Sequence, residues 1–332
     1  MKKGLSVLIL LYSAGCAAQS GGSADTSLTP APTAIVEEDV TVATPAGNIA
    51  GTVELPAARF PVPVVLIIAG SGPTDRNGNS PILPGPNNSL KMLADSLAAR
   101  GIASLRYDKR GIGGSRVAGS SEVDLRFEHF ISDAAAWVAQ LRADPRFSTI
   151  TVAGHSEGSL IGMVAAREAN ADGYISIAGV GRRAPEVLKD QLSTQLPPAM
   201  LAQTETLMAR IARGESPDSV PPMLNALFRP SVHPYLTSWF AYDPAAEIAR
   251  LTIPVLIIQG TTDIQVAVEE ANLLSAANPR AKLAVIEGMN HVLKSASGLI
   301  GQQLPSYSDP SLPLLPAFVG EVATFVKSLP AR

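Results

Sequence analysis

The segment Gly154-His155-Ser156-Glu157-Gly158 decides how this sequence is expected to fold. It follows a strand-like run at 148–153 and precedes a helix-like run at 159–170. A G-x-S-x-G pentapeptide in that context predicts a sharp, strained turn that presents Ser156 as a nucleophile. A side chain at either glycine would collide with the neighbouring strand or helix. The turn places the serine oxygen at a helix N-terminus, where the free N–H of Glu157 can face a developing oxyanion.

Outward from this turn, short apolar runs alternate with helical patterns. Residues 36–44 and 48–55, split by Pro45-Ala46-Gly47, predict a β-hairpin. The continuous apolar run 63–69 is typical of a strand covered on both faces. Further strands are expected at 102–107, 150–153, 174–178, 255–259 and 282–287, and helices at 89–100, 125–142 and 319–328. The alternation predicts a mostly parallel, doubly wound α/β sheet.

Residues 180–243 break the alternation, because they contain no strand run. They hold helical patches at 184–195 and 199–212 and a cluster of aromatic residues, namely Phe228, Tyr235, Trp239, Phe240 and Tyr242. We interpret this segment as a helical insertion after the sixth strand. With Met200, Met208 and Met223 it is expected to cap an apolar acyl pocket. The alternative is that these residues only pack the insertion onto the sheet.

Composition excludes some classes of protein. The chain has 332 residues, of which 46% are hydrophobic and 17% charged, enough for one large core. The formal net charge of −3 and the absence of a basic run argue against a nucleic-acid partner. No apolar run reaches 18 residues, so no membrane-spanning helix is expected in the mature chain.

The first residues have the pattern of an export segment. Lys2 and Lys3 precede the apolar run 4–12, and Ser13-Ala14-Gly15-Cys16 follows it. Cys16, the only cysteine, lies where a bacterial lipobox places the lipidated residue, although Ser13 stands where leucine is usual. We therefore predict a signal peptide at 1–16 and an exported lipoprotein anchored by Cys16, facing the periplasm or the cell exterior.

The alternative to lipidation is ordinary secretion, with cleavage near Ala18. In either case residues 17–35, which are mostly Ala, Gly, Ser, Thr and Pro, have almost nothing to bury and predict a flexible linker. The folded domain is then expected to comprise residues 36–330.

The general base can be sought among four histidines. His129 lies within a predicted helix, His155 is the variable residue of the serine turn, and His233 lies in the insertion. His291 follows the last predicted strand, at the sheet edge that also carries the serine. We therefore predict His291 as the base; the alternative is a structural or surface histidine.

The acid and the second oxyanion donor are expected in two other loops at this edge. Asp263 closes Gly260-Thr261-Thr262-Asp263 after the strand 254–259, where a carboxylate can accept the other imidazole N–H; a turn-forming aspartate is the alternative. The loop Ala69-Gly70-Ser71-Gly72-Pro73 lets the backbone approach a substrate, and the amide of Ser71 is the predicted donor opposite Glu157. The alternative is a generic Gly-Pro turn.

Several segments carry a more specific resemblance. They read Gly70-Ser71-Gly72-Pro73-Thr74-Asp75-Arg76-Asn77-Gly78, Tyr107-Asp108-Lys109-Arg110-Gly111-Ile112-Gly113-Gly114-Ser115, Phe228-Arg229-Pro230-Ser231 and Gly260-Thr261-Thr262-Asp263. Over residues 36–330 the chain resembles bacterial serine esterases of the α/β-hydrolase superfamily, in the group around the thermophilic esterase EstD. The chain order Ser156, Asp263, His291 is also the order of that superfamily. One departure is Ala69, where many relatives carry histidine.

The resemblance implies a carboxylesterase acting on short- to medium-chain acyl esters, with a small-molecule ester as its partner and no metal or organic cofactor. It also implies that residues 107–115 form a structural loop beneath the oxyanion loop, with locally paired charges. Two other functions stay open. One is a serine peptidase or aminopeptidase of the same fold, for which Glu186 and Glu205 are candidate substrate-holding groups. The other is a surface lipoprotein that binds without catalysis.

Overall fold

The computed structural model describes residues 34–119, 121–217 and 219–331. The predicted signal peptide, the lipidation residue Cys16 and nearly all of the linker 17–35 lie outside these described residues. Within the described part of the chain, no helix is both long and apolar enough to cross a membrane.

One sheet of eight strands runs through the molecule in the order β1-β2-β4-β3-β5-β6-β7-β8. The strands are β1 Val36–Thr44, β2 Gly47–Leu55, β3 Val62–Ile68, β4 Ala103–Tyr107, β5 Phe147–His155, β6 Gly173–Ile177, β7 Val255–Gly260 and β8 Lys282–Ile286. The hairpin β1–β2 is antiparallel and pairs antiparallel with β4, whereas the pairs from β4 to β8 are parallel. Each predicted strand is present, and the predicted bounds differ by one to three residues at most ends.

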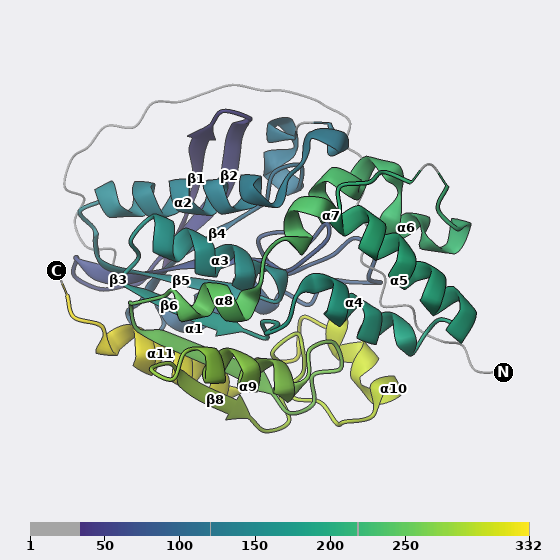
Figure 1. Cartoon of the computed structure of the whole chain (residues 1–332). Coiled ribbons are helices and arrows are strands. Elements are labelled where there is room, and N and C mark those ends of the chain that lie inside the picture. The colour runs from purple at the N-terminus through teal and green to yellow at the C-terminus, as the bar shows by residue number, and fades with distance from the viewer. Residues whose placement is uncertain (1–33, 120, 218, 332) are drawn as a thin grey trace.

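Helices cover both faces of this sheet (Figure 1). They are α1 Ser89–Ala98, α2 Phe127–Ala143, α3 Glu157–Glu168, α9 Val268–Ala277 and α11 Pro316–Ser328. The short helix α10 Ile300–Gln303 lies in the connection between β8 and α11. Residues of α2, α3 and α9 share one hydrophobic core, and residues of α1 and α11 share the other. Neither α9 nor α10 was among the helices predicted from the sequence.

Strand β3 explains why the sheet is buried on both sides. Val64 and Leu66 point into the core shared with α2 and α3, and Val65 and Ile67 point into the core shared with α1 and α11. Side chains alternate across a strand, so a strand with a core on each face needs a continuous apolar run. Burial on both faces of β3 therefore explains the continuous apolar run at 63–69.

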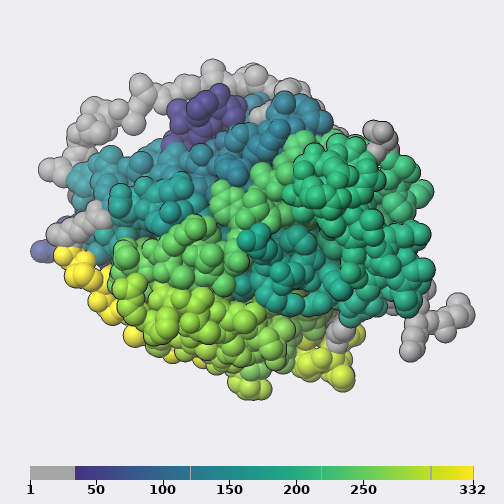
Figure 2. Space-filling view, in the orientation of Figure 1, coloured from purple at the N-terminus to yellow at the C-terminus, as the bar shows by residue number. Residues whose placement is uncertain are grey.

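The described part of the segment between β6 and β7 contains no strand and consists of helices joined by loops. Its α-helices are α4 Ala184–Ser193, α5 Pro198–Ala212, α6 Asn225–Phe228, α7 His233–Phe240 and α8 Pro244–Ala249. Helices α4 to α7 form the right-hand end of the molecule in Figure 2. Aromatic contacts hold this end to the sheet layer: Phe127 of α2 lies 6.3 Å from Tyr235 and 5.1 Å from Tyr242, between ring centroids.

Candidate active site

The serine turn has the strained geometry that the pentapeptide predicts. Ser156 lies between β5 and α3 with φ 55° and ψ −122°, a conformation that a non-glycine residue rarely adopts. A Cβ on Gly154 would lie 2.0 Å from the carbonyl oxygen of Gly158, and a Cβ on Gly158 would lie 2.6 Å from that of Ala69. Both glycines are therefore required sterically, as predicted. Glu157 is the first residue of α3, where backbone N–H groups have no intrahelical acceptor.

The predicted acid and base meet through one hydrogen bond. His291 Nδ1–H donates to Asp263 Oδ2 over 2.8 Å, and both side chains are buried. Asp263 lies in the loop after β7, and its Oδ1 accepts the backbone N–H groups of Gln265 at 2.8 Å and Val266 at 3.0 Å. With Nδ1 protonated, the neutral imidazole has Nε2 available to accept a proton.

Electrostatics keep Asp263 ionised. Burial by itself would raise the pKa of this carboxyl group, but the charge of His291 and hydrogen bonds from His291, Val266 and Gln265 outweigh that effect, so the pKa lies below its ordinary value. An ionised carboxylate fixes the imidazole tautomer and stabilises the imidazolium when the ring takes up a proton.

Ser156, His291 and Ser71 all line one pocket of about 400 Å³. A cavity of this size is in the range of small-molecule sites. Gly70 lies beside the serine, since a Cβ on it would come within 3.1 Å of the Cβ of Ser156. The structure thus brings the predicted nucleophile, base and oxyanion loop to one edge of the sheet.

Comparison with known proteins shows what this chain is similar to. A family model described as serine aminopeptidase, S33, matches residues 87–222, which include Ser156 but neither Asp263 nor His291. Esterase EstD of Thermotoga maritima is 30% identical over 274 residues, which cover 80% of this chain and 62% of the relative. The chain therefore spans less than two thirds of that relative. The resemblance to EstD-like proteins expected from the motifs is confirmed.

Solved structures share the fold at low sequence identity. Est1E from Butyrivibrio proteoclasticus superimposes with a TM-score of 0.56 at 18% identity, covering 87% of this chain and 97% of that one. An esterase of Pyrococcus furiosus gives 0.56 at 17% identity, covering 97% and 98%. The chain therefore has the α/β-hydrolase fold. The predicted fold class is therefore correct.

The pocket is walled by other segments than the insertion that was expected to cap it. Beyond the reacting groups, the lining comes from the β3–α1 loop (within 72–89), from 264–265 and 292, and from Leu304 and Tyr307. None of the described residues of the insertion 180–243 lines it. Met208 is buried in the hydrophobic core, and Met223 is 57% exposed. The lining of this pocket does not support the predicted cap, and the contacts of the insertion fit the alternative that it packs onto the sheet layer.

His155, which the sequence analysis set aside as the variable residue of the turn, supports the base. Its Nε2–H donates to the backbone carbonyl of His291 over 2.8 Å, and the two rings lie 4.7 Å apart. Burial, followed by repulsion from His291, lowers the pKa of His155 to about 3, so the ring is neutral. The sequence indicated this role only through the presence of a histidine at the variable position of the turn. No local pattern connects that position to the loop of His291, 136 residues away.

Lys294 is a second supporting residue that sequence reasoning missed. Its buried Nζ donates to the carbonyl oxygens of Asn87 at 2.7 Å and Asp309 at 2.6 Å, and burial lowers its pKa. It follows His291 by three residues. The bond to Asn87 ties the base-bearing loop to the pocket wall before α1, so Lys294 links the base to the substrate site.

The remaining histidines have structural partners. His129 lies in the first turn of α2 and accepts the N–H of Arg126 over 3.3 Å, so it caps the helix. His233 donates from Nε2 to the carbonyl of Phe228 over 2.7 Å.

The charges of the loop 107–115 are paired locally, as the resemblance implied. Asp108 bonds to Arg76 over 2.8 Å, Lys109 to Glu157 over 3.1 Å, and Arg110 to Asp133 over 2.6 Å. Among the described residues, the carboxylates that could together hold a metal are those of Glu37, Glu54 and Asp95, whose oxygens lie within 4.8 Å of one another.

Two cations already occupy the surroundings of these carboxylates. Lys91 pairs with Glu37 at 3.1 Å and with Asp95 at 2.7 Å, and Arg106 pairs with Glu54 at 3.2 Å. A metal would have to displace these side chains. The carboxylates lie outside the pocket that contains Ser156.

Proposed function

We propose that this chain is a serine esterase that hydrolyses uncharged, short- to medium-chain carboxylic esters through an acyl-enzyme on Ser156. The observation that carries the proposal is the lining of the pocket. It contains Ser156 and His291, and none of its described lining residues is an aspartate, glutamate, lysine or arginine. An uncharged acyl or alkyl group therefore enters without leaving a buried charge unpaired.

The first stage forms the acyl-enzyme. His291 Nε2 takes the proton of Ser156 Oγ as that oxygen attacks the ester carbonyl carbon. The carbonyl oxygen becomes an oxyanion, which the backbone N–H groups of Ser71 and Glu157 are positioned to bind. Asp263 stabilises the imidazolium. When the tetrahedral intermediate collapses, the C–O bond to the alcohol breaks and His291 returns its proton to the departing alkoxide oxygen.

The second stage regenerates the enzyme. Water loses a proton to His291 and attacks the acyl carbon. The new oxyanion accepts hydrogen bonds from the same two backbone N–H groups. Collapse breaks the bond to Ser156 Oγ, which recovers its proton from His291, and the carboxylic acid leaves. Apolar side chains at the pocket wall, including Ile82, Leu83 and Leu304, offer an acyl chain a surface out of water.

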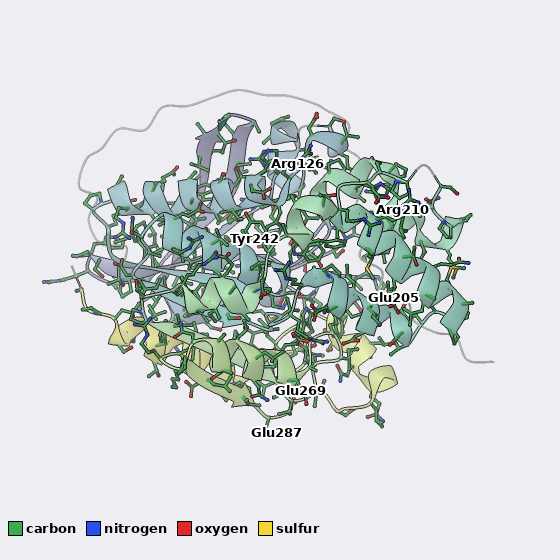
Figure 3. All side chains as sticks on the ribbon, viewed as in Figure 1. Arg126, Glu205, Arg210, Tyr242, Glu269 and Glu287 are labelled. Carbon is green, nitrogen blue, oxygen red and sulfur yellow. The ribbon has the colours of Figure 1, made fainter. Side chains whose placement is uncertain are left out.

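A peptidase is the competing hydrolase, since the matching family model is described as a serine aminopeptidase. An aminopeptidase needs an anionic group to hold the substrate's amine. The two candidates from the sequence do not line the pocket: Glu186 is exposed, and Glu205 pairs with Lys189 at 3.0 Å on α5, at the right of Figure 3. Because none of the described lining residues is an aspartate, glutamate, lysine or arginine, the pocket favours an ester substrate over a substrate with a free amine.

Parallel assays with p-nitrophenyl esters and aminoacyl-p-nitroanilides test the proposal. We expect ester hydrolysis to exceed amide hydrolysis, and Ser156→Ala to lose at least about 10⁴-fold in kcat. A fluorophosphonate probe should label the wild type and not this variant. Full activity in Ser156→Ala refutes the serine assignment. Preference for the anilides supports the peptidase. A wild type that neither turns over nor labels supports the non-catalytic binding lipoprotein.

We further propose that the chain is exported and anchored through a lipid on Cys16. The proposal is supported by the charged start, the apolar run 4–12 and the position of the single cysteine. Mass spectrometry of the native N-terminus is the test, with a lipid-modified Cys16 expected. A mature protein that begins at Gln19 without a lipid contradicts the anchor and supports ordinary secretion.

A further inference from the structure

One buried ammonium group connects the two halves of the oxyanion hole. Lys109 Nζ donates to the carbonyl oxygen of Gly70 over 2.5 Å and to Glu157 Oε2 over 3.1 Å. Gly70 immediately precedes Ser71, and Glu157 is the residue after the nucleophile. The side chain of Lys109 thus bonds to Glu157, whose own backbone N–H is one proposed oxyanion donor. It also bonds to Gly70, whose neighbour Ser71 carries the other proposed donor.

A tyrosine of the helical insertion completes the cluster. Tyr235 of α7 donates its hydroxyl hydrogen to Glu157 Oε1. Burial and the negative charge of Glu157 raise the pKa of Tyr235 well above its ordinary value, so the phenol keeps its proton. Lys109, Glu157 and Tyr235 are each less than 10% exposed. Each oxygen of the Glu157 carboxylate therefore has its own donor.

Stability alone gives a weak reason for such a cluster. Removing two charges from water costs several kcal/mol per ion, and their attraction repays this only partly, so apolar residues of similar volume are often as stable. A buried ion pair does, however, have only one favourable geometry, because each member needs the other. It can therefore hold two separate loops in a fixed relation.

We propose that Lys109, Glu157 and Tyr235 form a positioning clamp that sets the distance between the Ser71 and Glu157 amides, and thereby the binding of the oxyanion in the transition state. The proposal rests on the esterase function proposed above. It also assigns a role to the insertion, which does not line the pocket: α7 fixes the carboxylate of Glu157 from behind. None of the three side chains lines the pocket, so they act through the backbone that they hold.

The test compares two double variants, each of which neutralises one ion pair made by the loop 107–115. Lys109→Met/Glu157→Gln removes the clamp while leaving no single buried charge, and the backbone amide of Glu157 remains. Arg110→Met/Asp133→Asn is the matched control, because Arg110 is the next residue and its buried partner Asp133 lies on α2, away from the oxyanion loop. Tyr235→Phe is the mildest variant, since it removes one hydroxyl group.

The readouts separate positioning from stability. Esterase kcat and KM are measured on p-nitrophenyl butyrate, together with inhibition by an alkyl trifluoromethyl ketone, which forms a tetrahedral oxyanion adduct with the serine. Inhibition by the corresponding unreactive alkyl ether reports ground-state binding, and thermal unfolding reports the fraction folded. A defect in the oxyanion hole weakens inhibition by the ketone and lowers kcat together, and it leaves inhibition by the ether unchanged.

We expect the clamp variant to lose about 10- to 100-fold in kcat, with KM and ether inhibition within about threefold of the wild type. The ketone inhibition constant should rise by the same factor as kcat falls. Tyr235→Phe should show the same pattern with a loss of about three- to tenfold. The control variant should unfold at a lower temperature but keep the wild-type ratio of ketone to ether inhibition.

The clamp is refuted if the folded clamp variant and Tyr235→Phe both keep the wild-type ketone-to-ether ratio, or if the control variant shifts it equally. If the clamp double variant does not fold, Tyr235→Phe decides alone. An inactive, unlabelled wild type is a different result, because it refutes the proposed function itself. An active wild type with unaffected clamp variants refutes only this inference.

Discussion

Two hollows in the molecule differ sharply in charge. The pocket beside Ser156 has no Asp, Glu, Lys or Arg among its described lining residues, whereas the hollow near the β1–β2–β4 side of the sheet is lined by acidic and basic side chains together, including Glu37, Arg76, Arg106 and Asp108. In the second hollow these charges already bond to one another. Arg76 bonds to Asp108 over 2.8 Å, and Arg106 bonds to Glu37 and Glu54.

The difference shows that charge density alone does not mark a functional site. The charged hollow contains ion pairs that hold the hairpin and the loop before α1 against β4. The uncharged pocket is lined by two imidazoles, those of His155 and His291, and the buried carboxylate of Asp263 supports His291. Changes at the pocket should therefore affect turnover, and changes at the charged hollow should affect stability. Three variants test this contrast.

The largest effect is expected from Asp263→Asn. The amide cannot hold His291 in the tautomer that leaves Nε2 free, nor stabilise the imidazolium, so kcat for ester hydrolysis should fall about 10⁴-fold. Steady-state kinetics with thermal unfolding as the control is the measurement. A fall smaller than tenfold contradicts the assignment of Asp263 as the acid.

Arg106→Met should give the opposite pattern. Arg106 is 1% exposed and neutralises Glu54, so its removal leaves a buried carboxylate without its cation. We expect a loss of about 3 kcal/mol in the free energy of unfolding at pH 8, measured with urea. The kcat per folded molecule should stay within about threefold of the wild type. A large fall in kcat with unchanged stability overturns the distinction between the two hollows.

Glu54→Gln should give the smallest effect, and only at higher pH. Burial, followed by the negative charge of Asp95, raises the pKa of Glu54 to about 7 from its ordinary 4.5. The native state therefore retains a proton that the unfolded chain releases between pH 4.5 and 7, and wild-type stability falls as the pH rises through this range.

Glutamine cannot ionise, so Glu54→Gln should be more stable than the wild type by about 1–2 kcal/mol at pH 8 and equally stable near pH 4.5. Urea unfolding at the two pH values is the measurement. The added substitution Glu54→Gln should also restore part of the stability lost in Arg106→Met. If the variant is less stable at pH 8, the ionised carboxylate is a net stabiliser and the assigned direction is wrong.

Sequence patterns predicted the features that depend on neighbours in the chain. Strand β3 was visible because a strand buried on both faces must be apolar throughout, and Gly154 and Gly158 were visible because the turn excludes a Cβ there. The positions of Asp263 and His291 followed from the rule that loops after parallel strands meet at one sheet edge. Each of these inferences uses a local pattern together with one general property of parallel sheets.

Contacts between distant segments were decided only by the tertiary structure. Three features depend on the relative placement of segments far apart in the chain. They are the choice of loops that line the pocket, the hydrogen bond from His155 to the carbonyl of His291, and the bonds by which Lys109 joins Gly70 to Glu157. Side-chain types do not encode such placement, because a buried lysine and a surface lysine look the same in a sequence. The candidate reacting residues were thus readable from the chain, and the shape and support of the pocket around them came from its folding.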